Sequence, residues 1–119
     1  MSSYVSLRTY TLKREADPAE FERAFAEVKP VLGLQKVLLL KGYAGDDPTL
    51  AGSEFDYASI HIYASPEEAA YTVKLAVEAQ TRPELSEPLL RLVKFWRVAH
   101  SGELADALVN GFTLVAETP

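Results

Sequence analysis

The stretch FDYASIHIYASPEEA, residues 55–69, decides the fold. Its first part contains no Gly or Pro and alternates between two kinds of side chain, which is typical of a strand with two different faces. One face is aliphatic and the other is aromatic and polar: Ala58, Ile60 and Ile62 against Phe55, Tyr57, Ser59, His61 and Tyr63. Ser65, Pro66 and Glu68 then match a capped helix start. The stretch therefore predicts a strand that leads directly into a helix.

The same pattern occurs earlier in the chain. Tyr4 to Leu12 is rich in β-forming residues and predicts a strand. Asp17 and Pro18 then predict the start of a helix. Apolar residues follow at steps of three and four, which is the period of one helical face: Phe21, Ala24, Phe25, Val28 and Leu32. The helix is expected to end near Lys29 or to kink at Pro30.

A second strand is predicted over Val37 to Tyr43. Its four consecutive apolar residues, Val37 to Leu40, indicate burial on both faces. The second helix is expected to be interrupted at Thr81 to Pro83, after which an apolar stripe continues to Val93.

The C-terminal region predicts three short elements after the second helix. A fourth strand is expected over Phe95 to His100, and a helical turn over Leu104 to Val109. Asn110 and Gly111 indicate a turn, and Phe112 to Ala116 a short fifth strand.

Composition indicates one globular domain. The chain has 119 residues, is 48% hydrophobic and carries a net charge of −5, so residues 1–119 form one domain with a core at 4–100 and an extension at 101–119. Because it has no cysteine, disulfides, thiolate metal sites and Cys nucleophiles are excluded. An acidic pI near 5.0 argues against nucleic-acid partners. No apolar run is long enough for a membrane span and Met1 to Leu7 is not a signal peptide, so a cytoplasmic protein is expected.

The predicted order over residues 4–100 is strand, helix, strand, strand, helix, strand. This is the α+β, ferredoxin-like βαββαβ arrangement, an antiparallel sheet with two helices on one face. The sequence resembles the dimeric α/β-barrel superfamily, and residues 55–69 are the stretch in which this resemblance is found. That superfamily includes small antibiotic-biosynthesis monooxygenases, polyketide cyclases and EthD-like proteins. The resemblance implies a homodimer in which the uncovered sheet faces pack together, with a pocket in each half.

Two features of the residues agree with a homodimer. If Phe55, Tyr57 and Tyr63 lie on the uncovered sheet face, a lone subunit would expose an apolar patch of the kind that marks interfaces. The predicted fifth strand, Phe112 to Ala116, would either reach the neighbouring subunit or cover an edge of its own sheet.

The candidate site combines the polar faces of the first and third strands. In the first strand Ser6, Arg8 and Tyr10 alternate with apolar residues. The two strands are expected to lie side by side and parallel, so their polar faces would line one cavity. The predicted lining is Arg8, Tyr10, Tyr57, Ser59, His61 and Tyr63, with Arg97 from the fourth strand and Lys41 and Tyr43 from the second as further candidates.

These residue types suit an aromatic or polyketide-like ligand. Aromatic walls stack on planar rings, a guanidinium at Arg8 or Arg97 favours an anion, and His61 can exchange a proton near neutral pH. If the protein is an enzyme, we assign His61 as general acid/base, Arg8 as the stabiliser of negative charge, and Tyr57 or Tyr63 as an orienting donor. The reaction would be a cofactor-free cyclisation or monooxygenation.

A non-catalytic ligand-binding or structural dimer of the same fold is the alternative. In that interpretation His61 is a packed structural residue, Arg8 pairs with an acidic residue across the dimer, and Tyr57 and Tyr63 fill the interface.

No metal or cofactor is predicted. The chain has only two histidines, His61 and His100, and the acidic pair Asp46 and Asp47 lacks calcium-loop spacing. Haem-degrading relatives of the fold use an Asn in the first strand and a His in the second helix, and neither is present in the predicted elements. The sequence also lacks a Gly-rich phosphate loop and a nucleophile elbow.

Overall fold

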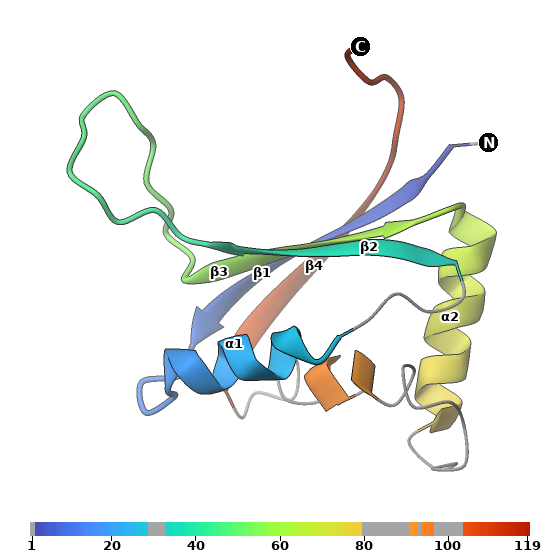
Figure 1. Cartoon of the computed structure of the whole chain (residues 1–119), viewed down its shortest axis with the longest axis horizontal. Helices are drawn as coiled ribbons and strands as arrows, with labels where there is room; N and C mark the ends of the chain where they lie inside the picture. The colour runs from blue at the N-terminus through green and yellow to red at the C-terminus, as the bar shows by residue number, and fades with distance from the viewer. Residues whose placement is uncertain (1, 29–32, 80–90, 93, 97–103) are drawn as a thin grey trace.

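A computed structural model describes residues 2–28, 33–79, 91–92, 94–96 and 104–119. Its elements are β1 (Tyr4–Leu12), α1 (Pro18–Ala26), β2 (Leu34–Lys41), β3 (Tyr57–Tyr63), α2 (Pro66–Ala79) and β4 (Ala105–Thr113). The strands form one sheet in the order β2-β3-β1-β4, with every neighbouring pair antiparallel. The described helices lie on one face of the sheet (Figure 1). The predicted α+β, ferredoxin-like fold is confirmed.

Both helices begin at the predicted caps. The Asp17 carboxylate accepts a hydrogen bond from the Ala19 amide at 3.0 Å, and Pro18 is the first helical residue of α1. The Ser65 hydroxyl accepts from the Glu68 amide at 3.1 Å and starts α2 in the same way. Because these bonds satisfy amides that have no partner within the helix, they fix where each helix begins. Helix α1 ends at Ala26, earlier than predicted.

The core consists of two clusters between the sheet and the helices. In one, the Phe21 ring of α1 lies 5.0 Å from Tyr10, 4.8 Å from Tyr57 and 5.8 Å from Phe95, measured between ring centroids. The second cluster contains Leu34, Tyr63, Ala69, Ala76 and Leu92. Both clusters are built on the same face of β1 and β3.

This burial contradicts the expected exposure of the aromatic face. Tyr57, Ser59, His61 and Tyr63 are at most 2% exposed and lie beneath the helices, whereas the aliphatic alternate residues of β3 occupy the face that no described helix covers. Alternation shows that a strand has two faces but does not show which face the helices cover. Large rings fill the space between a sheet and its helices, and the polar groups of Tyr57, Ser59 and His61 are hydrogen-bonded there, so this face can be the inner one.

The prediction that the first and third strands are parallel is also wrong. Helix α1 carries the chain from β1 across to β2, which leaves a gap that β3 fills. Because β3 follows β2 in the chain and pairs with it, β3 runs antiparallel to both neighbours. The register nevertheless places Arg8 opposite Ser59 and Ser6 opposite His61.

The fourth strand lies later in the chain than predicted. Residues 94–96, assigned in part to a strand, are helical, and Arg97 to His100 lie outside the described residues. The edge strand is β4, in place of the predicted helical turn, the turn at Asn110 and Gly111, and a separate fifth strand. Phe112 and Thr113 pair with Val5 and Tyr4 of the same chain, and residues 114–116 are not in a strand. Pairing along the whole edge of β1 overrides the local turn signal.

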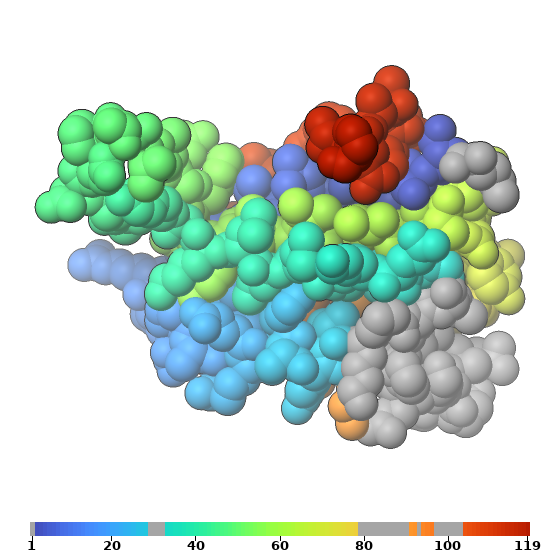
Figure 2. Space-filling model, turned by 45° about the horizontal axis from the view of Figure 1, so that its top comes forward, coloured from blue at the N-terminus to red at the C-terminus, as the bar shows by residue number. Residues whose placement is uncertain are grey.

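The predicted burial of the second strand on both faces is wrong as well. Leu38 and Leu40 are 37% and 46% exposed, because alternate residues of β2 face the uncovered side of the sheet. On the same side Leu108 of β4 is 60% exposed. Loop 42–56 and the C-terminal tail both rise from this side (Figures 1 and 2). The uncovered face is therefore apolar and partly framed by these two segments.

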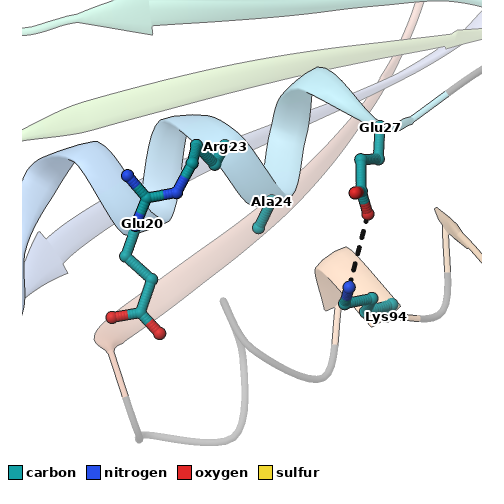
Figure 3. Close-up of a pocket in the computed structure, with 5 residues that line it drawn as sticks. All are labelled: Glu20, Arg23, Ala24, Glu27 and Lys94. Atoms are coloured by element: carbon teal, nitrogen blue, oxygen red, sulfur yellow. Dashed lines mark hydrogen bonds and ion pairs between the residues drawn. The ribbon is translucent and has the colours of Figure 1, made fainter.

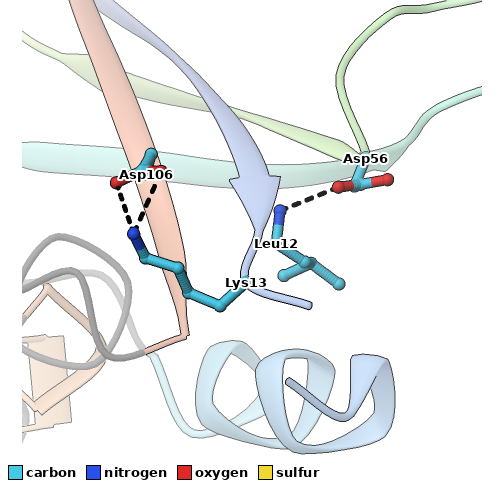
Figure 4. A network of polar contacts seen from close by, with 4 residues as sticks. All are labelled: Leu12, Lys13, Asp56 and Asp106. Carbon is cyan, nitrogen blue, oxygen red and sulfur yellow. Dashed lines mark hydrogen bonds and ion pairs between the residues drawn. The ribbon is translucent and has the colours of Figure 1, made fainter. Parts of the chain in front are cut away.

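Two polar contacts join the strand ends near α1 (Figure 4). The Leu12 amide donates to the Asp56 carboxylate at 2.7 Å, and Lys13 Nζ lies 3.0 Å from an Asp106 oxygen. The first contact links β1 to the residue before β3 and the second links it to β4, so they hold the three strands in register where the exposed ends would otherwise fray.

We expect Phe21→Ala to lower the free energy of unfolding by about 3–5 kcal/mol, because this ring is fully buried among three others. The exposed Leu50→Ala variant should change it by no more than about 0.5 kcal/mol. Urea denaturation monitored by circular dichroism measures both. Equal effects of the two substitutions would show that the aromatic cluster is not the core.

Candidate functional site

The predicted site residues of the two central strands lie together. Residues directly opposite one another in an antiparallel pair point to the same face. The pairs on the inner face are Tyr4 with Tyr63, Ser6 with His61, Arg8 with Ser59, and Tyr10 with Tyr57. Polar groups thus form a continuous patch in the layer between sheet and helices. Arg97 lies outside the described residues.

A chain of hydrogen bonds crosses this patch. The Tyr10 and Ser59 hydroxyl oxygens are 2.8 Å apart, and Ser59 Oγ lies 3.4 Å from His61 Nδ1. On the other side of the imidazole, Trp96 Nε1 donates to His61 Nε2 at 3.2 Å. Since an indole nitrogen only donates, Nε2 is the acceptor, and neutral His61 carries its proton on Nδ1 toward Ser59. The arrangement fixes both the tautomer and the orientation of the ring.

Trp96 is the residue of the candidate site that the sequence interpretation missed. It was placed in the predicted fourth strand, whereas residues 94–96 are helical and bring it over β1 and β3. Its ring centroid lies 6.1 Å from that of His61 and 4.6 Å from the Arg8 guanidinium carbon. The available signal was its rarity, because it is the only tryptophan in the chain.

Arg8 brings positive charge into the buried layer. The side chain is 7% exposed, stacks on Trp96, and donates from Nε to Ser6 Oγ at 3.1 Å. Burial lowers the pKa of Arg8, an effect opposed by the nearby Tyr10, Tyr63 and Tyr4 hydroxyls. Arginine stays charged at neutral pH even so. Burial also raises the pKa values of Tyr10 and Tyr63, so both remain hydrogen-bond donors. A buried cation beside neutral donors is suited to bind an anion.

Tyr57 belongs to a different network. Its hydroxyl donates to the Glu22 carboxylate of α1, and its ring stacks on Phe21. Burial, then Glu22, raises the pKa of Tyr57 to about 12. Tyr57 therefore shares the inner face but does not belong to the hydrogen-bond chain through His61.

Lys41 and Tyr43 lie at the end of the sheet, away from His61. Both are exposed, and with Phe55 they line a surface hollow of about 220 Å³ at the base of loop 42–56. Asp47 of that loop accepts from the Thr49 amide at 2.9 Å, so it caps a local turn.

The outer side of α1 carries a charged groove (Figure 3). Glu27 and Lys94 form an ion pair at 3.4 Å across it, with Glu20 and Arg23 nearby. Because these side chains are exposed, water competes for their charged groups and the ion pair is weak. Pairing of surface charges is therefore a sufficient explanation of the groove.

The described residues contain neither a candidate metal site nor a helix that could span a membrane. Nowhere in the described ranges do three or more His, Asp or Glu side chains gather in a way that could hold a metal ion. Among the helices that the structure describes, none is long and apolar enough to cross a membrane.

Comparison with known proteins supports the fold. No protein-family model and no curated protein sequence matches the chain. Among solved structures it is similar to SnoaB, a cofactor-independent oxygenase from Streptomyces nogalater, with a TM-score of 0.54, 15% identity, and coverage of 100% of this chain and 99% of that chain. It is equally similar to a dimeric ferredoxin-like protein of unknown function from Thermobifida fusca, with a TM-score of 0.54, 14% identity, and coverage of 95% and 92%.

A third similar structure is a DABB-family protein with a ferredoxin-like fold from Mesorhizobium loti, with a TM-score of 0.51 and 13% identity over 98% of this chain and 100% of that chain. These structures show that the chain has a ferredoxin-like fold, which is the fold that the resemblance implies.

The pKa of Tyr57 gives a spectroscopic prediction. Its folded pKa of about 12 exceeds the ordinary value of 10.0, so the native state holds a proton that the unfolded state releases. Native stability should therefore fall as the pH rises from 10.0 toward 12. Tyr10 and Tyr63 also have raised pKa values, so titration of phenolate absorbance should show several late tyrosines, and Tyr57→Phe should remove the amplitude of one tyrosine near pH 12. An unchanged late amplitude in that variant would show that Tyr57 is not one of the late tyrosines.

Proposed function

We propose that this protein is a homodimeric, cofactor-independent monooxygenase of an electron-rich aromatic or polyketide-like compound. The observation that supports this most is the hydrogen-bond chain Tyr10, Ser59, His61 and Trp96 beside the buried Arg8. Buried polar groups are costly unless they are bonded, and their concentration under two helices is typical of a site that handles charge. The similarity to SnoaB agrees with this chemistry.

Arg8 and the surrounding rings provide recognition of the substrate. A planar ligand would stack against Trp96, and its developing phenolate or enolate would lie beside the Arg8 guanidinium. Because the charge on Arg8 is screened from water, it stabilises an anion more strongly than a surface arginine would. The site would therefore favour the deprotonated form of its ligand.

His61 would accept the substrate proton at Nε2. The Trp96 indole occupies this nitrogen in the structure, so a substrate that delivers its proton there would replace the indole as the partner of His61. The opposite nitrogen would keep its contact with Ser59, and Tyr10 would extend the chain. The resulting imidazolium would donate from Nδ1 to Ser59 and from Nε2 to the substrate anion.

The redox step would need only the substrate and dioxygen. The deprotonated carbon of a methylene group would donate electrons to O2 directly. One oxygen atom would become the new carbonyl oxygen, and the other would leave as water with the two methylene hydrogens. Since the substrate supplies all the electrons, no external reductant is involved.

The uncovered sheet face would bind a second copy of the chain. This face exposes the large apolar side chains Leu38, Leu40, Leu108 and Phe112, and clusters of this kind mark interfaces. The radius of gyration of 15.2 Å exceeds the roughly 13.5 Å typical of a compact domain of this length. A partner chain on this face would cover the apolar side chains between loop 42–56 and the C-terminal tail (Figure 2). This interface would be mainly aliphatic, with Phe112 as its aromatic residue, in contrast to the aromatic interface that the sequence suggested.

We expect His61→Gln to slow oxygen uptake by about a hundredfold or more, because glutamine can accept the Trp96 hydrogen bond but cannot take a proton. The substrate is dithranol, a dihydroxyanthrone with an acidic methylene group, and an oxygen electrode measures the rate. Danthron, the corresponding dihydroxyanthraquinone, should still quench Trp96 fluorescence. Lys74→Gln at an exposed position of α2 is the control and should keep the full rate.

Two results would contradict the enzyme proposal. Full oxygen uptake by His61→Gln would remove His61 from the mechanism. Danthron binding with no oxygen uptake above the uncatalysed rate, even in the unmodified protein, would favour the non-catalytic alternative.

Leu108→Lys tests the dimer. Leu108 lies on the uncovered face and is 60% exposed, while Val77 on α2 is 61% exposed. Size-exclusion chromatography with light scattering should give twice the 13.1 kDa chain mass for the unmodified protein and for Val77→Lys. A lysine on the sheet face should yield monomers. A dimeric Leu108→Lys variant would place the interface elsewhere.

A further inference from the structure

Two buried hydroxyl groups next to the His61 network have no hydrogen-bond partner. Among the described residues, they are Oη of Tyr63 on β3 and Oγ1 of Thr72 on α2. The side chains are 1% and 0% exposed, so bulk water does not satisfy them. Nearly all buried polar groups in folded proteins are bonded, and a pair of exceptions in one layer needs an explanation.

Neither hydroxyl is needed for packing. A threonine within a helix usually bonds to the carbonyl oxygen one turn earlier, here that of Glu68, and Thr72 does not make this bond. Valine and phenylalanine have nearly the same shapes as threonine and tyrosine without an unsatisfied oxygen. The two hydroxyls therefore reduce the stability of the free protein, as is common for groups that serve ligand binding.

Both hydroxyls border one region of the layer. Ala69 and Ala76 lie three residues before and four after Thr72, so the three side chains share a face of α2. That face packs on Tyr63 in a single cluster of buried residues. The Arg8 guanidinium acts electrostatically on the Tyr63 hydroxyl, so the region adjoins the cation of the site.

The spacing along β3 places this region beside the reactive nitrogen. Tyr63 follows His61 by two residues on the same face, a rise of about 6.6 Å. Ser59, which holds the opposite side of the imidazole, lies in the other direction along the strand. If the acidic carbon of a planar ligand lies at His61, an oxygen of the ligand about one ring away from that carbon would reach Tyr63 and Thr72.

We propose that Tyr63 and Thr72 form an oxygen-recognition subsite, which binds a hydroxyl group on the ring edge of a polycyclic aromatic substrate. Each of the two hydroxyl groups can donate a hydrogen bond. The subsite therefore selects substrates that carry an oxygen acceptor at that edge. The inference rests on the proposed function and adds a specificity determinant, Thr72, which the candidate site residues do not include.

The test compares two ligands in two variants. Tyr63→Phe and Thr72→Val remove the hydroxyls and keep the side-chain shapes. Danthron carries hydroxyl groups that anthraquinone lacks, and quenching of the single tryptophan, Trp96, measures binding of each. The loss of one neutral hydrogen bond should weaken danthron binding about three- to tenfold per variant and leave anthraquinone binding unchanged.

Matched controls lie outside the subsite. Tyr71→Phe on the exposed side of α2 and Thr113→Val at the exposed end of β4 should not alter the preference for danthron. Thermal denaturation without ligand provides a second readout. Tyr63→Phe and Thr72→Val should melt at the same temperature as the unmodified protein or higher, since each removes an unsatisfied buried oxygen.

Failure of the subsite and failure of the proposed function would give different binding results. If the unmodified protein binds danthron and both variants keep its preference over anthraquinone, the subsite is wrong and the proposed function stands. If neither compound quenches Trp96 in the unmodified protein, the proposed function fails and the subsite fails with it. A lower melting temperature in both variants would show that the hydroxyls are already bonded in the free protein, which would also overturn the subsite.

Discussion

The hydrogen bond from Trp96 to His61 is the interaction on which the inner face of this protein depends. β1 and β3 direct Ser6, Arg8, Ser59 and His61 into a layer that two helices close. Polar groups in such a layer are costly unless they form hydrogen bonds. The indole occupies one imidazole nitrogen and Ser59 the other, so His61 is held between a helical segment and the sheet.

The same constraint links the fold to its chemistry. Trp96 both bonds to His61 and lies against Arg8, so a single ring positions the candidate base and the candidate anion-binding cation. The aromatic cluster around Phe21 fixes the other end of β1 and β3 and ties Tyr57 to α1. The inner face of the sheet thus has an aromatic half and a polar half. The proposed ligand chemistry takes place in the polar half.

Much of the fold could be predicted from the sequence, because its signals are local. The caps at Asp17 and Ser65 and the alternation in β3 depend on neighbouring residues, and the structure confirms the helix starts and strands that they predict. The polar faces of β1 and β3 were also predicted to lie side by side, and they do so, although the predicted parallel pairing is wrong.

The remaining features depend on contacts between distant segments. Which face of β3 the helices cover is decided by packing with Phe21 and Ala69, and the β3 sequence is compatible with either face. β4 carries a turn-like Asn110–Gly111 pair that only pairing with β1 holds extended. Trp96 was missed because its neighbours resemble a strand, while its place over His61 follows from a helical segment at residues 94–96.

The central claim is that the ligand binds under the helices, at Trp96 and His61, and not on the uncovered sheet face. The proton–nitrogen NMR spectrum of the protein, which has a single tryptophan, tests this most directly. The account predicts one indole N–H signal that exchanges slowly with solvent and shifts when danthron is added. An indole signal that stays fixed at saturating danthron, while the methyl signals of Ile60 and Ile62 move, would contradict it.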